Sequence, residues 1–536
     1  MKGPFSVETR ISAESSLKKS TGRDFIPALV LALACLAARL PFTGRVLYHS
    51  DSARFALAME HFDVGQMRPH APGYVLYVGA ARLADFLFHD ARVSLIAVGL
   101  IASAAAVFIL YLLGAGMFGR STGFWGSLLF LASPLFWYNG EMPFTYTLDG
   151  ALTLAFAYAC FRSLDRSAGW LYASAILLAL ATGSRQNIII LLFPLWVFIL
   201  AKFPLKKIIL SILVFGLTCL AWTAPLVILS GGLARYLDAL GAQYARVVLH
   251  PAPFLFQVKT RGRILAGFLF TGLALGLAPL IYYLGRLLVK RRRLDVDTSK
   301  LAFLFFWIVP SLLFFVGVNI YNSGQVLVIL PALFLIVAAG LELLVGDLIH
   351  AFGRGISSKA LTAVAAAILL VAEASLFLFF DTAVSYASIK KEEGRLSEII
   401  RLTRENSAPG KTVILACRLN TQAGYYLPEY EVWCPFPLIF PDEELPIGSQ
   451  NVYVSRGRRT VPETYWKPTG FKIEPLLIPP GVETLVLWED ELAEFYEGPD
   501  RPLQTIGPGE SGAKIYRLPV KPEEKLYYGY HHFQIH

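Results

Sequence analysis

The stretch between Tyr48 and Tyr77 concentrates ionisable side chains between two apolar segments. Polar groups beside a bilayer mark function by default, whereas the alternative is a solvated loop whose charges face water. Asp51 is the candidate for chemistry, because a carboxylate at a membrane-facing cleft can take a proton from a hydroxyl group. Arg54, one helical turn further on, or Arg185 could tune that carboxylate through space. The structural alternative is that Asp51 or the following serine, Ser52, caps a short helix over residues 52–62.

His70 begins the sequence His-Ala-Pro-Gly-Tyr, which ends at Tyr74 and is typical of a turn before an apolar helix. His70 could bind a phosphate or a metal, or hydrogen-bond a neighbouring carboxylate, and a histidine at a helix entrance can also be purely structural. Glu141 and Asp149 follow at the outer ends of two apolar runs, where Asp149 is costly unless it is paired or hydrated. Either of them could hold a divalent cation together with Asp51, although no spacing pattern defines such a ligand set.

Several cationic side chains are candidates for binding an anion. Arg185 ends an apolar run, and its planar fork can donate two hydrogen bonds to a phosphate. The segment from Gly231 to Arg263 is rich in basic residues although it is expected outside, which indicates an anionic ligand; Arg246, Lys259 and Arg261 are its candidates. The alternatives are contacts with lipid headgroups and, for Arg185, snorkelling to the membrane interface.

The composition places these residues in a membrane protein. The chain has 536 residues, of which 55% are hydrophobic and only 16% charged, and its mean hydropathy is +0.54. That is too apolar for a soluble protein of this size. The net charge of +9 does not indicate nucleic-acid binding, because the basic residues form short clusters between apolar runs, as in the cytoplasmic loops of membrane proteins.

The apolar runs predict an α-helical polytopic membrane protein with about eleven transmembrane helices. Residues 1–24 form a cytoplasmic tail, residues 25–380 the membrane module, and residues 43–92 its first external loop, with an interfacial helix over residues 73–88. Arg39, near the outer end of the first span, is expected to snorkel, and Lys290–Arg293 is the strongest cytoplasmic signal. The predicted spans are Phe25–Phe42, Val93–Met117, Gly123–Trp137, Tyr146–Phe161, Trp170–Thr182, Ile188–Leu200, Ile208–Leu229, Ile264–Val289, Leu301–Val318, Val326–Leu344 and Leu361–Phe380.

Residues 381–536 are more polar and predict a small extracytoplasmic α/β domain. A charged helix is expected over 390–406 and a helical turn over 491–496. The expected strands are Thr412–Ala416, Asn451–Val454, Thr484–Trp488 and Lys514–Leu518. Cys417 and Cys434 lie in this domain and could form a disulfide there, since the compartment outside the cytoplasm is oxidising. No Gly-rich phosphate loop or Cys/His metal pattern is visible in the sequence.

The residues from Asp51 to Tyr77 resemble the first external loop of GT-C-fold membrane glycosyltransferases, closest to the protein O-mannosyltransferase-like branch. The resemblance rests on Asp-Ser-Ala-Arg-Phe-Ala from Asp51 and Arg-Pro-His-Ala-Pro-Gly-Tyr-Val-Leu-Tyr from Arg68. Weaker similarities lie at Ser133–Gly150 and Tyr321–Pro331. The chain departs from the family pattern at Ala71 and Val75, where prolines are usual, and at Ser52, where many members have a second acidic residue.

The resemblance implies an outward-facing active site that takes a sugar from a polyprenyl-phosphate donor and transfers it, with inversion, to a hydroxyl or amine. It makes Asp51 the catalytic general base, places His70 and Tyr74 in the donor cleft, and makes Glu141 or Asp149 the acidic residue of the second loop. Arg185, with Arg246, Lys259 or Arg261, would then hold the lipid phosphate.

The implied partners are a polyprenyl-phosphate-linked sugar, a glycan, lipid or protein acceptor and membrane lipids, at the cytoplasmic (inner) membrane with the N-terminus inside. No cofactor is firmly indicated, and a divalent cation stays open. Two other classes compete with this interpretation. A lipid or glycan transporter or flippase would need polar residues at mid-bilayer depth and broken helices, of which the sequence shows few. A non-catalytic envelope scaffold would use the C-terminal domain to bind a partner.

Overall fold

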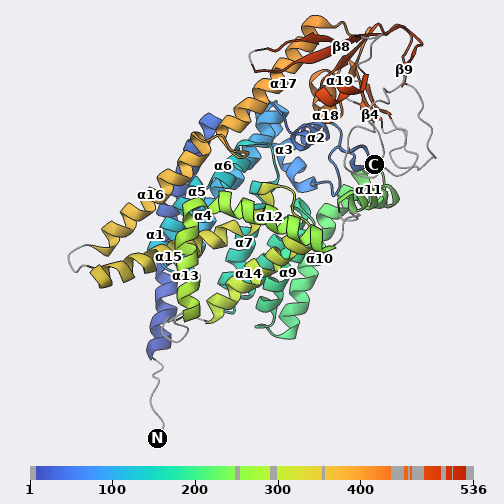
Figure 1. Ribbon diagram of the computed structural model, residues 1–536. Helices are drawn as coiled ribbons and strands as arrows, with labels where there is room; N and C mark the ends of the chain where they lie inside the picture. Colours follow the sequence, from blue (N-terminus) through green and yellow to red (C-terminus); the bar gives the residue numbers. More distant parts are fainter. Residues whose placement is uncertain are drawn as a thin grey trace. The chain divides into compact units, whose positions relative to one another are not determined.

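The computed structural model describes residues 8–247, 254–289, 298–352, 357–435, 452–456, 459–461, 476–496, 502–509 and 511–526 (Figure 1). The predicted cytoplasmic signal Lys290–Arg293 lies outside the described residues. Contacts divide the chain into two units. A helical unit contains Met1–Thr43, Tyr74–Ile228 and Tyr244–Ala387, and a sheet unit contains Gly44–Gly73, Leu229–Gln243 and Ser388–His536.

All eleven predicted spans fall on helices of the helical unit, because long apolar runs leave the backbone no other way to satisfy its hydrogen bonds in lipid. Three of them are not continuous α-helices: the third breaks at Ser133 between α5 and α6, the eighth at a 3-10 turn between α12 and α13, and the tenth begins in the 3-10 helix η4 (Ser323–Val328). The helices are α1 (Glu8–Arg39), α4 (Ala91–Met117), α5 (Arg120–Ala132), α6 (Pro134–Glu141), α7 (Tyr146–Ser163), α8 (Ala168–Ser184), α9 (Ile188–Leu200), α10 (Leu205–Leu229), α12 (Phe254–Leu273), α13 (Leu277–Val289), α14 (Thr298–Gly317), α15 (Leu330–Phe352) and α16 (Ser358–Leu378).

Seven apolar segments among the described residues are long enough to cross a membrane, so the count of eleven spans is not confirmed. α8 and α9 are apolar but shorter, and α5, α6 and α7 carry more polar side chains, which are buried inside the unit. The protein is therefore a multi-pass membrane protein in which helices of several lengths pack together.

Arg39 does not snorkel, and the expectation from the sequence is wrong there. Its side chain is fully buried, and it donates hydrogen bonds to the carbonyl oxygens of Phe136 at 2.9 Å and Trp137 at 3.0 Å. Its guanidinium also lies 4.3 Å from the centre of the Phe136 ring. The carbonyls of α6 thus provide partners inside the protein that are closer than the membrane surface.

The two helices expected in the first external loop are present as α2 (Ser50–Glu60) and α3 (Val75–Phe88), with a short 3-10 turn η2 (Val64–Gln66) between them. α3 belongs to the helical unit and buries one face, which includes Tyr77 and Ala81. Its other face exposes Leu83, Phe86 and Leu87. This amphipathic division suits a helix at a membrane interface, and that location remains a prediction.

The sheet unit is built on a seven-stranded mixed sheet in the order β4-β3-β2-β1-β6-β8-β7. The central strand β1 (Thr412–Leu415) pairs in parallel with β2 (Glu431–Pro435) and with β6 (Thr484–Leu487), and the remaining neighbours are antiparallel. The four predicted strands are confirmed as β1, β3 (Val452–Arg456), β6 and β8 (Ile515–Pro519). The sequence did not predict β2, β4 (Arg459–Val461), β5 (Leu476–Leu477), β7 (Gln504–Ile506), β9 (Lys525–Leu526) and α18 (Asn420–Tyr426).

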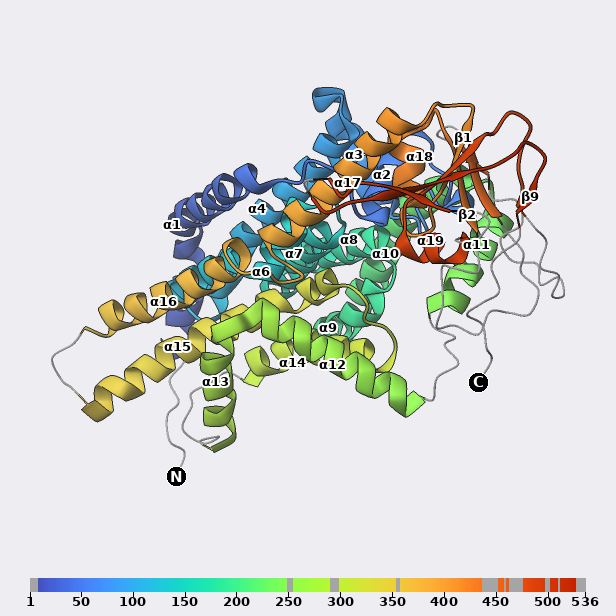
Figure 2. The same ribbon diagram turned by 45° about the horizontal axis from the view of Figure 1, so that its top comes forward.

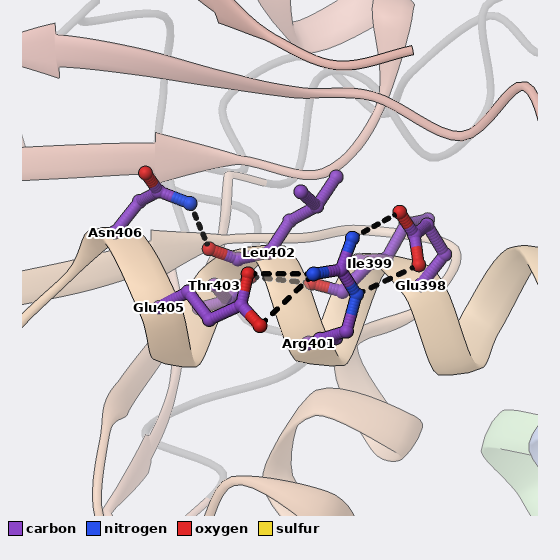
Figure 3. A network of polar contacts seen from close by, with 7 residues as sticks. All are labelled: Glu398, Ile399, Arg401, Leu402, Thr403, Glu405 and Asn406. Carbon is purple, nitrogen blue, oxygen red and sulfur yellow. Dashed lines mark hydrogen bonds and ion pairs between the residues drawn. The ribbon is translucent and has the colours of Figure 1, made fainter. Parts of the chain in front are cut away.

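Helices cover this sheet from the same unit (Figure 2). The predicted charged helix is α17 (Tyr386–Asn406), and the predicted helical turn is α19 (Asp490–Tyr496). α17 turns Leu396 and Ile399 into a core shared with β1 and α18. Its outer face carries Arg401, which bonds Glu398 and Glu405 one turn to either side (Figure 3). The charged pattern that predicted this helix is therefore its solvent face.

Cys417 and Cys434 lie at the ends of the paired strands β1 and β2, and both are buried free thiols. A hydrogen bond with Cys434, together with burial, raises the pKa of the Cys417 thiol. The two sulfurs are thus adjacent, as a disulfide would require, and the bridge itself remains a prediction.

Candidate active site

Asp51 lies in the first turn of α2, and His49 is the residue that caps this helix. The Nδ1 atom of His49 accepts the backbone N–H of Asp51 at 3.2 Å. The structural alternative in which Asp51 or Ser52 provides the cap is therefore wrong. A carboxylate in the first helical turn still interacts favourably with the positive end of the helix dipole.

The side chains of Arg54, His70 and His49 approach the carboxylate of Asp51, which is 26% exposed. The Nη1 atom of Arg54 lies 3.6 Å from Oδ1 of Asp51, one helical turn along α2. The Nδ1 atom of His70 lies 3.5 Å from the same oxygen. Of the roles considered for His70, the structure thus shows the contact with a neighbouring carboxylate. Asp51, Arg54 and His70 form the cluster named here the Asp51 cluster.

Hydrogen bonds hold the loop that carries His70 on both sides of this residue. Asp63 and Arg68 exchange two backbone hydrogen bonds, of 2.7 and 2.9 Å. Arg235, in the first turn of α11 (Leu233–Val247), donates to the carboxylate of Asp63 at 2.7 Å. The neighbouring Tyr236 hydroxyl donates to the carbonyl of Pro72 at 3.2 Å. These contacts all lie in the sheet unit and hold the turn around His70 in one conformation.

A second cluster lies in the helical unit, around the carboxylate of Asp149 in the first turn of α7. Oδ2 accepts from Nε of Arg185 at 2.8 Å and from the hydroxyl of Thr145 at 3.1 Å. Oδ1 accepts from the hydroxyl of Ser184 at 2.6 Å. Nη2 of Arg185 donates to the Thr145 hydroxyl at 2.7 Å. The expectation that Asp149 needs a partner is confirmed, and Arg185 is that partner rather than a snorkelling side chain.

Two tyrosine rings complete this Asp149 cluster. The guanidinium carbon of Arg185 lies 4.4 Å from the ring centre of Tyr146 and 5.3 Å from that of Tyr74. Tyr74 caps α3 with φ of 45°, a left-handed conformation that bulky residues rarely adopt and that often marks functional sites. Hydrogen bonds and aromatic faces together fix the plane of the guanidinium.

The other predicted site residues lie elsewhere in the helical unit. Glu141 is fully buried at the end of α6 and feels the charge of Arg39. Arg261, on α12, is bound to the carbonyl of Gly317 and to the side chain of Gln257. Lys259 is exposed on the same helix. Arg246 lies in α11, and its side chain is outside the described part of the structure.

Sequence reasoning overlooked Thr145, Tyr146, Ser184 and His49 as members of these clusters. Ser184 precedes Arg185 directly, and Thr145 and Tyr146 lie about one helical turn before Asp149, so proximity to a charge was an available signal. His49 gave none, because histidine is not a preferred helix cap. Among the described residues, no group of three or more His, Cys, Asp or Glu side chains is arranged to hold a metal ion.

Comparison with known proteins was made in three ways. Residues 74–229, which include Arg185 and Asp149, match the sequence profile of the dolichyl-phosphate-mannose-protein mannosyltransferase family. No curated protein matches the chain. Two solved structures are similar over nearly the whole chain.

The first is ArnT from Cupriavidus metallidurans bound to undecaprenyl phosphate, with 12% identity and a TM-score of 0.56 over 92% of this chain and 97% of that one. The second is the same protein in its apo state, with 13% identity and a TM-score of 0.53 over 94% and 98%. At 12% and 13% sequence identity, structural similarity shows that the folds are alike and nothing more about function. The chain therefore has the ArnT-like GT-C fold and carries the profile of the dolichyl-phosphate-mannose-protein mannosyltransferase family over residues 74–229, as its first external loop led us to expect.

Proposed function

We propose that this protein is a membrane glycosyltransferase that moves a sugar from a polyprenyl-phosphate donor to an acceptor at the outer face of the cytoplasmic membrane. The family profile and the GT-C fold support the class of enzyme and donor. The ArnT structure with undecaprenyl phosphate supports a lipid phosphate as the leaving group. The sugar is a hexose or a pentose.

The observation that carries the mechanism is the state of Asp51. Its carboxylate is not used as a helix cap, is partly exposed, and lies 3.5 Å from His70 and 3.6 Å from Arg54. A carboxylate with this access can take the proton of an acceptor hydroxyl or amine. The acceptor atom then attacks the anomeric carbon, the bond from that carbon to the phosphate oxygen breaks, and the configuration inverts.

The role of Arg185 follows from its unused donors. A guanidinium has five N–H donors, and the acceptors found for Arg185 among the described residues, Asp149 and Thr145, take two of them. The other N–H groups can bind phosphate oxygens in a fixed plane. Charge that develops on the leaving phosphate would be stabilised by a group that needs no reorganisation, which is the most effective form of electrostatic catalysis.

Asp51→Asn tests this proposal. Loss of a general base lowers the rate by about 10²- to 10⁴-fold, while thermal stability should change little because the side chain is partly exposed. The assay follows release of undecaprenyl phosphate from a panel of undecaprenyl-phosphate hexoses and pentoses in membranes that supply acceptors. Glu60→Gln makes the matched change on the exposed end of α2 and should keep full activity. Full activity of Asp51→Asn, or retention of the anomeric configuration in the product, would contradict the mechanism.

A further inference from the structure

The segment that leads into Asp51 is bound to the C-terminal part of the chain through its backbone. The backbone N–H groups of Arg45 and Val46 both donate to Oε1 of Glu393, the latter at 3.3 Å. Glu393 belongs to α17 and is 5% exposed. Its other oxygen accepts from Lys390 at 3.0 Å. One buried carboxylate thus holds two successive amides of the loop, an arrangement stronger than a neutral hydrogen bond.

The next two residues are bound by α18. The N–H of Leu47 donates to the hydroxyl of Tyr426 at 2.7 Å. The carbonyl of Tyr48 accepts from the side-chain amide of Gln422 at 2.6 Å. Four consecutive residues therefore each give a backbone group to a side chain that lies more than 340 positions away in the sequence. Random surface contact rarely satisfies an entire backbone run in this way.

Apolar packing reinforces the same contact. Leu47 is fully buried, and Val46 and Tyr48 pack against the core formed by α17, α18 and β1. α18 also contacts α2, beside which it lies in both views (Figures 1 and 2). The segment from Arg45 to Tyr48 is thus part of the fold of the C-terminal domain, although it belongs in sequence to the first external loop.

We propose that the C-terminal domain positions the general base of the transferase, with Glu393, Gln422 and Tyr426 as its positioning residues. This inference rests on the proposed role of Asp51. Tyr48 precedes Asp51 by three positions, and His49 then caps the helix on which Asp51 lies. The place of the carboxylate is therefore set by the domain rather than by the loop alone. A misplacement of about 1 Å is enough to cost up to about 100-fold in rate.

Two substitution series test the inference in the full-length protein. Glu393→Ala removes the acceptor of two amides, and Tyr426→Phe removes one hydroxyl. Both should lower kcat by about ten- to hundredfold and leave KM for the undecaprenyl-phosphate sugar unchanged, because they displace Asp51 without touching the donor. Glu393→Gln keeps an acceptor oxygen and should retain most of the activity. Lys411→Gln breaks an exposed ion pair with Glu483 in the same domain and serves as the control.

Hydrogen exchange of the peptide covering residues 44–50 separates positioning from a general loss of stability. Exchange there should rise in Glu393→Ala and Tyr426→Phe, with the sheet strands still protected. Unchanged exchange, or raised exchange with wild-type kcat, would overturn the inference. If Glu393→Ala does not fold, the milder Tyr426→Phe decides. Should Asp51→Asn itself keep full activity, the proposed function fails, while the exchange result still shows whether the domain holds the loop.

Discussion

The Asp51 cluster and the Asp149 cluster place the same residue type in opposite surroundings. Asp149 is 3% exposed and has its two oxygens occupied by three donors at 2.6 to 3.1 Å. Asp51 is 26% exposed, and nitrogen atoms of His70 and Arg54 lie 3.5 and 3.6 Å from its Oδ1. A carboxylate that exchanges a proton with a substrate has to be reached by that substrate, whereas a carboxylate that fixes an arginine can be buried.

The exposure and the hydrogen bonds of a carboxylate thus distinguish between two acidic residues that are both candidates for a catalytic role. Burial alone would favour Asp149 as the functional residue, because intramembrane carboxylates are usually functional. However, both of its oxygens already accept hydrogen bonds, and one of these bonds fixes the position of Arg185. The comparison predicts that changes in the Asp149 cluster reduce stability, in addition to any loss of rate through Arg185, and that changes in the Asp51 cluster reduce the rate with little effect on stability.

The largest effect is expected when Arg185 is replaced by methionine. This leaves the Asp149 carboxylate buried without its charge partner, which costs about 3–5 kcal/mol of unfolding free energy. Thermal unfolding in detergent, followed by tryptophan fluorescence, measures the loss. Adding Asp149→Asn to the same protein should recover more than half of it, since no uncompensated charge then remains. The comparison would be contradicted if the double variant were no more stable than Arg185→Met. It would also be contradicted if Arg54→Met, in the Asp51 cluster, lost as much unfolding free energy as Arg185→Met.

Glu489 provides a further test, because both of its carboxylate oxygens accept hydrogen bonds, as those of Asp149 do, and it lies in the C-terminal domain. It accepts the backbone N–H groups of Cys417, Arg418 and Leu419 at 2.6 to 3.1 Å. Glu489→Ala leaves these buried donors without an acceptor and should cost about 3 kcal/mol in unfolding free energy. Glu489→Gln keeps one acceptor oxygen and should cost less. Equal losses in the two variants would show that the hydrogen bonds are not the cause.

The pH dependence of Glu489 gives an independent check. Burial raises the pKa of this carboxyl group, and the three backbone N–H groups offset the rise only in part. The folded state therefore holds the proton more tightly than the unfolded state. The stability contributed by this group is complete below its unfolded pKa of about 4.3 and declines as the pH rises through the folded value. Thermal unfolding between pH 4 and 8 should show this decline in the wild type, and Glu489→Gln should flatten it.

The elements that could be predicted from the sequence are those whose signal is local. The long apolar runs gave the membrane helices, and the charged period of residues 390–406 gave α17. β1 and β6 were visible as short apolar runs. β2 was not, because its sequence Glu-Val-Trp-Cys-Pro contains a charge and a proline. The count of eleven spans is not confirmed, because apolarity does not distinguish a helix in lipid from one packed inside protein.

The parts of the site that escaped prediction depend on contacts between distant residues. The sequence shows that Asp149 needs a partner, and only the fold shows that Arg185, 36 positions away, provides it. Arg39 found carbonyl partners about 100 positions away instead of the membrane surface. Gln422 and Tyr426 carry no motif at all, and their role appears only when the first external loop is seen packed on them. Local patterns cannot encode such pairings.

The smallest effects come from removing one side chain that contacts the aspartate in each cluster. His70→Ala takes away the imidazole beside Asp51 and should lower kcat about tenfold, because the carboxylate loses a neighbour that orients it. Its effect on unfolding free energy should stay below about 1 kcal/mol, since the Asp51 side chain remains partly hydrated.

Thr145→Val is the counterpart in the Asp149 cluster. It keeps the shape of a side chain that is 1% exposed, and it removes both the hydrogen bond to Asp149 and the acceptor of Arg185. It should cost about 1–2 kcal/mol of unfolding free energy and change kcat less than His70→Ala does. Measuring kcat and the free energy of unfolding for both variants shows whether each cluster affects mainly the rate or mainly the stability. If His70→Ala proved the more destabilising and Thr145→Val the slower enzyme, the two carboxylates would have to exchange roles, and Asp149 rather than Asp51 would be the better candidate for the base.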